Sequence, residues 1–133
     1  MDKLKFEQVI NEIIYKINST ENDLNAISIV GSVGSGKTKV MSSLFTILKE
    51  KRLNVHYYSP AVSASLNEEL PLDDNIISLS KDGILFIDES YYFDIESLIK
   101  DARKNNTLCI FSCQDERDLN SGIIPYIDII YHL

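Results

Sequence analysis

Three glycines precede a lysine and a threonine in the octapeptide GSVGSGKT, residues 31–38. Glycine adopts backbone angles that are closed to other residues, so successive N–H groups of such a loop can turn inward around an anion. A lysine directly after the glycines would reach bound phosphates, and a threonine hydroxyl would offer an oxygen ligand to Mg²⁺. The candidate phosphate-binding loop comprises Gly31, Ser32, Val33, Gly34, Ser35, Gly36, Lys37 and Thr38.

A second group of candidate residues is the acidic pair near the end of GILFIDES, residues 83–90. Asp88 follows an apolar run, an arrangement called Walker B in nucleotide-binding proteins, and Glu89 comes directly after it. We expect the Asp88 carboxylate to hold Mg²⁺ through a water molecule, opposite the Thr38 hydroxyl. Glu89 could orient an attacking water or accept its proton. The alternative is a solvated strand end, and the glycine loop upstream favours the catalytic interpretation.

The apolar run TLCIFSC, residues 107–113, is followed by Gln114. Alternation along a strand places Ser112 and Gln114 on one face and Cys113 on the other. If this strand lies between the two strands that carry the candidate loop and the acidic pair, either polar side chain could contact a γ-phosphate or the attacking water. An ordinary polar strand end remains the alternative for both residues.

Apolar periodicity predicts the elements that must position these residues. Helical spacing predicts helices over residues 3–18, 37–51 and 95–104. Short apolar runs rich in β-branched residues predict strands over residues 26–30, 53–59, 83–90, 107–113 and 126–132. Residues 60–82 are the least regular part, with one short element expected around Ile76 and Ile77.

The alternation of strands with helices indicates an α/β fold with a mostly parallel sheet. Because the strands are apolar runs, both faces of the sheet should be covered by helices, which gives a three-layer α-β-α core. The 133 residues suffice for one domain, residues 1–133. We expect an amphipathic helix and linker over residues 1–23 and a nucleotide-binding core over residues 24–133.

The net charge of −7 limits the possible partners. A chain this acidic would not hold nucleic acid by bulk electrostatics, so contact with DNA would require a local patch or assembly with other chains. The basic runs at residues 49–52 and 100–104 each close a predicted helix, where cations meet the negative end of the helix dipole.

No stretch approaches the roughly 20 apolar residues of a membrane span, and the N-terminus lacks the apolar run of a signal peptide. We therefore expect a cytoplasmic protein with no membrane partner. Cys109 and Cys113 lie in one predicted strand, where four positions span about 13 Å, too far for a disulfide. We expect both to be buried, reduced thiols.

The glycine loop, the strand that ends in Asp88 and Glu89, and the polar-ended strand after it resemble the additional-strand, catalytic-glutamate division of P-loop NTPases. That division includes AAA+ proteins, RecA-like motors, FtsK/HerA-type translocases and viral packaging ATPases. The resemblance covers most of residues 24–133 and leaves the N-terminal helix outside. It implies a five-stranded sheet of order 5-1-4-3-2, with the fourth strand between the two Walker strands.

Within that division, residues 113–119 followed by residues 127–130 are similar to the ending of FtsK/HerA-type and packaging ATPases. Gln114, Asp118 and Leu119 match its spacing. Those motors usually carry larger insertions than this chain has room for, and the lid of helicase-loader ATPases is absent from these residues. An arginine from a neighbouring subunit often completes such sites. Arg117 and Arg103 are the candidates here.

Type II thymidine kinases are the rival resemblance. Their strand-helix rhythm is similar, and DESYYF, residues 88–93, resembles their DE-x-x-F stretch. Glu89 would then deprotonate a nucleoside hydroxyl. These kinases also carry a cysteine-rich zinc module and a C-terminal lasso, whereas this sequence has no cysteine pairs with metal-ligand spacing and ends at Leu133.

Together these residues predict an ATP-binding hydrolase in which water attacks the γ-phosphate. Lys37 and the loop amides would stabilise charge, Thr38 and Asp88 would hold Mg²⁺, Glu89 would orient the water and Gln114 would assist. Hydrolysis would drive work on DNA or on a partner protein, in a homo-oligomer or complex. A nucleoside phosphotransferase and a nucleotide-gated binding module with slow hydrolysis remain as alternatives.

Overall fold

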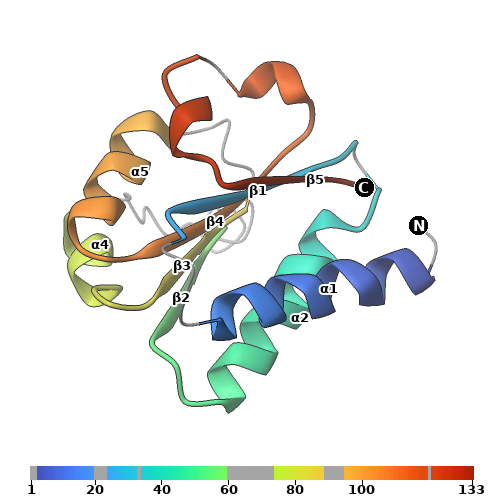
Figure 1. Cartoon of the computed structure of the whole chain (residues 1–133), viewed down its shortest axis with the longest axis horizontal. Helices are drawn as coiled ribbons and strands as arrows, with labels where there is room; N and C mark the ends of the chain where they lie inside the picture. The colour runs from blue at the N-terminus through green and yellow to red at the C-terminus, as the bar shows by residue number, and fades with distance from the viewer. Residues whose placement is uncertain (1–2, 20–23, 33, 60–73, 89–94, 120) are drawn as a thin grey trace, which may run out of the picture.

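The computed structural model describes residues 3–19, 24–32, 34–59, 74–88, 95–119 and 121–133. Within these residues, five parallel strands form one sheet of order β2-β3-β4-β1-β5 (Figure 1). This confirms the predicted order, with the fourth strand between the first and the third. The strands are β1 (Ala26–Val30), β2 (Val55–Tyr58), β3 (Ile84–Ile87), β4 (Leu108–Cys113) and β5 (Ile129–His132).

Helices cover both faces of the sheet and give the predicted three layers (Figure 1). On one face lie α1 (Lys3–Asn18) and α2 (Lys37–Glu50), and on the other lie α4 (Asp74–Leu79) and α5 (Ile95–Lys104). The interior strands β1, β3 and β4 are buried along their whole length, which explains why they are apolar runs in the sequence.

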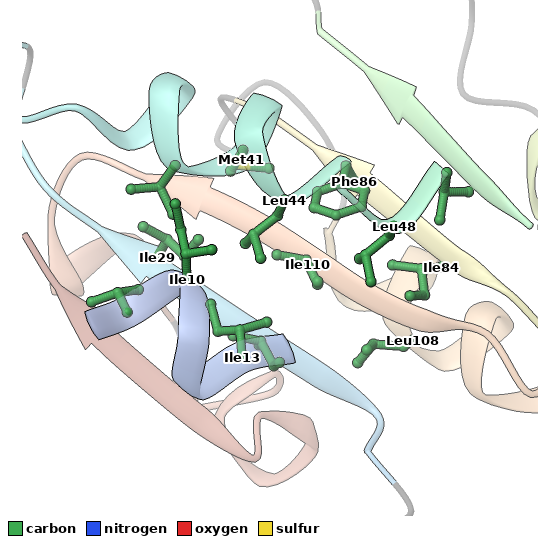
Figure 2. Packing of buried hydrophobic residues seen from close by; sticks show 14 residues of the cluster. Ile10, Ile13, Ile29, Met41, Leu44, Leu48, Ile84, Phe86, Leu108 and Ile110 are labelled. Carbon is green, nitrogen blue, oxygen red and sulfur yellow. The ribbon is translucent and has the colours of Figure 1, made fainter. Parts of the chain in front are cut away.

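The core on the α1 and α2 face is built from aliphatic side chains. Figure 2 shows Ile10 and Ile13 of α1 with Leu44 of α2 over the sheet residues Ile29 and Ile110. All five side chains are buried. Burying such a side chain contributes about 1.5–3 kcal/mol, so α1 is an integral part of this layer.

The C-terminal part differs from the prediction in one respect. The strand expected over residues 126–132 begins only at Ile129, because Ile124–Tyr126 forms a 3₁₀ helix. Proline fixes its own φ near −65°, and Pro125 lies within this short helix. The Asp128 carboxylate then accepts hydrogen bonds from the backbone N–H groups of Asn25 and Ala26, at 2.6 and 3.0 Å, and holds β5 beside β1.

No helix in the described part of the chain is long and apolar enough to cross a membrane.

The C-terminal end of α2 allows a test of backbone strain. Arg52, just after α2, has a φ of 62°, a conformation that costs an L-residue about 1–2 kcal/mol. Arg52→Gly should raise the free energy of unfolding by about 0.5–1 kcal/mol, since part of the relief is offset by the greater freedom of glycine in the unfolded chain. Urea unfolding measures this change. The matched control Lys51→Gly, at a φ of −78°, should give no gain; an equal gain in both variants would contradict the explanation.

Candidate nucleotide-binding site

The candidate phosphate-binding loop connects the end of β1 to the start of α2. Gly34 and Gly36 have φ values of 83° and 96°, which only glycine adopts readily. Gly36 is the N-cap of α2, and no described side chain caps the helix. The first N–H groups of a helix lack intrahelical partners and carry the positive end of the dipole, so the start of α2 offers hydrogen-bond donors to an anion.

A side chain at Gly31 would collide with the loop itself. A Cβ built there would lie 2.3 Å from Ser35 Oγ and 3.3 Å from Leu133 Cβ. The Gly31 N–H donates to the carbonyl of Cys113 at 3.1 Å, which places the start of the loop beside the end of β4. A side chain at position 31 would therefore force Ser35 to move, whereas Gly34 is favoured by its positive φ.

Lys37 begins α2 and is 9% exposed. Its Nζ donates a hydrogen bond of 2.8 Å to the carbonyl oxygen of Gly31, so the ammonium lies folded over the loop. A phosphate oxygen in the loop would be a charged acceptor for the same group, and hydrogen bonds between charged partners are roughly twice as strong as neutral ones.

Asp88 lies directly after β3 and is 2% exposed. Its Oδ2 accepts hydrogen bonds from Thr38 Oγ1 at 2.8 Å and from Tyr57 Oη at 3.1 Å. Its Oδ1 accepts from Ser112 Oγ at 2.6 Å. Three elements, α2, β2 and β4, thus converge on one carboxylate, which satisfies a buried charge that would otherwise be costly.

The donor set at Thr38 and Asp88 fits Mg²⁺. The Thr38 hydroxyl directs its hydrogen toward Asp88, so its lone pairs remain for a cation. Mg²⁺ takes oxygen ligands and is commonly held by one or two carboxylates together with substrate phosphates. Within the described residues no group of three or more His, Cys, Asp or Glu side chains could hold a metal ion.

Gln114 contributes to the same site from the end of β4. It is exposed and lines a cavity of about 530 Å³ over the loop. The other lining residues are Ser32, Gly34, Gly36, Lys37, Thr38, Lys39 and Ser42. Gln114 thus lies beside the loop, whereas Ser112 contacts Asp88.

Tyr57, Lys39 and Ser42 are site residues that the sequence does not predict. Tyr57 lies near the carboxyl end of β2, and its register partner Phe86 lies two positions before Asp88. The sequence signal is a polar aromatic residue near the end of a strand. It becomes informative only once β2 is known to pair with β3. Lys39 and Ser42 follow the loop in the first turns of α2.

Several predicted residues lie outside the described residues. They are Val33 of the loop and Glu89; Tyr91, Tyr92 and Phe93 of the kinase-like stretch, residues 88–93, also lie there. The roles of Val33 and Glu89 remain predictions.

The two candidate arginines lie at opposite ends of the strands, Arg103 at the amino ends and Arg117 at the carboxyl ends. Arg103 lines a cavity with Asn25, Asn54 and Gly83, at the amino ends of the strands and therefore away from the loop. Arg117 follows β4 on the loop's side of the sheet, and its side chain is 89% exposed and pairs with Asp115 at 2.9 Å. Of the two arginines, only Arg117 lies at the carboxyl ends of the strands, where the candidate phosphate-binding loop also lies.

Asp118 and Leu119 have local roles in folding. The Asp118 carboxylate accepts a hydrogen bond from the backbone N–H of Asp115 at 3.2 Å and completes a capping box on the 3₁₀ helix Glu116–Asp118. Leu119 is buried in the core on the α5 face. The helix cap and the core contact account for Asp118 and Leu119 at these positions, and neither requires a bound nucleotide.

Cys109 and Cys113 are free and buried, as expected. Burial raises the pKa of the Cys109 thiol to about 12. The pKa of Cys113 is also raised, mainly by burial. Neither thiol is primed as a nucleophile, because the reactive thiolate is disfavoured in both.

No known family model matches this chain, and no curated protein matches its sequence significantly. Solved structures do match its fold. PCH-2 of C. elegans superposes with a TM-score of 0.66 at 19% identity, over 99% of this chain and 43% of that chain. The Holliday junction branch migration motor RuvB of Thermotoga maritima gives 0.66 at 17% identity, over 100% and 45%. AMPPCP-bound DnaA from Aquifex aeolicus gives 0.62 at 18% identity, over 95% and 44%.

At sequence identities of 17–19%, the similarity to these structures shows a shared fold and nothing further. The chain shares with these three structures an α/β fold with a P-loop-like core, and it spans less than half the length of each of them.

Proposed function

We propose that this chain binds ATP with Mg²⁺ at the candidate phosphate-binding loop and hydrolyses the γ-phosphate. The observation that carries the proposal is the convergence of three features at one edge of the sheet. The uncapped glycine loop supplies N–H donors, the Lys37 ammonium lies over it, and the Thr38 hydroxyl meets the buried Asp88 carboxylate. Each matches one requirement of a bound nucleoside triphosphate.

The residues divide the chemistry between them. The loop amides and Lys37 would hold the β- and γ-phosphates, with the Lys37 ammonium exchanging the Gly31 carbonyl for a phosphate oxygen. Thr38 and Asp88 would hold Mg²⁺, which neutralises charge that develops on the phosphates. Glu89 would orient the attacking water or accept its proton, and Gln114 would contact the γ-phosphate or the water.

We extend the proposal to work on DNA or on a partner protein, in a homo-oligomer or complex. The likeness to RuvB, described as a Holliday junction branch migration motor, and to DnaA, described as a replication initiator bound to single-stranded DNA, supports this direction. Arg117 is the proposed contact from a neighbouring subunit, because it is exposed at the nucleotide edge. Asp118 and Leu119 have folding roles of their own, so the proposal does not depend on an FtsK/HerA-type ending.

Phosphate release from ATP tests this function directly. The rate per subunit should rise with protein concentration or on addition of double-stranded DNA, since neighbours or DNA would complete the site. A second arm offers thymidine as acceptor. A rate near zero under every condition, with ATP bound, would contradict the hydrolase, and formation of thymidine monophosphate would replace it by a nucleoside kinase.

A further inference from the structure

Tyr57 links an edge strand of the sheet to the proposed metal site. It belongs to β2, and its Oη donates a 3.1 Å hydrogen bond to Oδ2 of Asp88. The same oxygen accepts the hydrogen bond from Thr38. A phenol and the threonine of the phosphate-binding loop therefore share one carboxylate oxygen.

The Tyr57 ring is held by two phenylalanines. It stacks on Phe86 of β3 with centroids 5.9 Å apart and an interplanar angle of 16°. Phe45 of α2 makes T-shaped contacts with both rings, at centroid distances of 5.6 Å to Tyr57 and 5.9 Å to Phe86. Offset-stacked and edge-to-face pairs are the favoured aromatic geometries, so this packing fixes where the phenol hydroxyl points.

Hydrogen bonds at both oxygens resist rotation of the Asp88 carboxylate. Ser112 donates to Oδ1, while Tyr57 and Thr38 donate to Oδ2. Thr38 is itself a proposed Mg²⁺ ligand, so its position would change with the metal. Tyr57, on a strand and in contact with both phenylalanine rings, would remain in place when the metal binds. Side chains that orient a metal ligand in this way typically account for about 10–100-fold in metal affinity or activity.

We infer that Tyr57 is a positioning residue, whose hydroxyl holds the Asp88 carboxylate in the orientation that binds Mg²⁺. The inference rests on the proposed function, because it assumes that Asp88 meets Mg²⁺ beside a bound nucleotide. In this role Tyr57 acts through the Asp88 carboxylate. A hydroxyl that merely satisfied a buried carboxylate would contribute to stability and leave the Mg²⁺ dependence of nucleotide binding unchanged.

The test is a Mg²⁺ titration of binding to a fluorescent ADP analogue, with the full chain. Tyr57→Phe keeps the ring and removes the hydroxyl. Its half-saturating Mg²⁺ concentration should rise about tenfold, while its affinity for the analogue in EDTA should stay within about twofold of the wild type. The matched control is Tyr15→Phe, which removes a phenol hydroxyl from a side chain that is 75% exposed on α1. It should leave both values unchanged.

A double-mutant cycle shows whether the hydroxyl acts through Asp88. In an Asp88→Ala background, Tyr57→Phe should have no further effect on the Mg²⁺ dependence. If Tyr57→Phe had the half-saturating Mg²⁺ concentration of the wild type, the inference about Tyr57 would be overturned and the proposed function would stand. An equal loss of binding in EDTA, or an undiminished effect in the Asp88→Ala background, would overturn the inference in the same way. A wild-type chain that binds no analogue at any Mg²⁺ concentration would overturn the proposed function and this inference with it.

Discussion

Replacing Lys37 by alanine should weaken ATP binding by about a hundredfold or more and abolish turnover. A charge-assisted hydrogen bond contributes about 1.5–3 kcal/mol, and the ammonium would make more than one such bond to the β- and γ-phosphates. Because about 1.4 kcal/mol corresponds to a factor of ten, two bonds already give this magnitude. Equilibrium binding of a fluorescent ATP analogue measures the loss.

Lys39→Ala is the matched control for that experiment. Lys39 lines the same cavity two positions along α2, is exposed, and holds its ammonium 5.3 Å from the centre of the Phe6 ring. Its removal changes the net charge of the site as much as removal of Lys37. We expect less than a tenfold loss of affinity. Equal losses in the two variants would show that general positive charge, rather than the position of Lys37, binds the nucleotide.

Glu89→Gln should leave ATP binding within about threefold of the wild type and lower the rate of phosphate release by about a hundredfold or more. Glutamine keeps the size of the side chain but cannot accept a proton from the attacking water, and general-base catalysis typically contributes about 10²–10⁴-fold. Single-turnover phosphate release, with binding measured in parallel, separates the two effects.

Asp88→Asn, one residue earlier, should have the opposite pattern, because it should weaken binding as well as turnover. It replaces a carboxylate that accepts from Thr38, Tyr57 and Ser112, so Mg²⁺-dependent binding itself should fall. If Glu89→Gln retained full turnover, Glu89 would have no role as the base. If Asp88→Asn kept the Mg²⁺ dependence of the wild type, Asp88 would not be a metal ligand.

The predicted bounds of helices and strands agree best with the structure where a short stretch of sequence determines the element. The helix over residues 3–18, the strand over residues 26–30 and the helix over residues 95–104 have the predicted bounds, because apolar spacing and the breaks at their ends determine them. The strand expected from Tyr126 begins later. There the 3₁₀ helix lies in a stretch that is apolar except for Pro125 and Asp128, and the contacts of Asp128 with the start of β1 are made over a long sequence separation.

The candidate site likewise has one part that the local sequence predicts and another that depends on contacts between distant residues. The glycine loop and its lysine are a contiguous pattern whose physical purpose can be deduced from the residues alone. The partners of Asp88 follow from strand pairing instead. Ser112 meets it because Ile87 of β3 pairs with Phe111 of β4, so each polar residue follows directly after a paired one. Tyr57 meets it because β2 pairs with β3 in parallel. Neither contact has a signature within a short stretch of sequence.

The position of β1 between β4 and β5 has a consequence for how the protein folds. Both neighbours of β1 come from the far end of the sequence; the carboxylate of Asp128 holds the backbone of Asn25 across a separation of 103 residues. Closing so long a segment costs entropy before the contacts are gained, and non-local pairing of this kind slows folding. During synthesis the glycine loop emerges early, but the strand that carries it is flanked on both sides only after residue 129 has been made. We therefore expect nucleotide-binding competence to appear late, at the completion of the sheet.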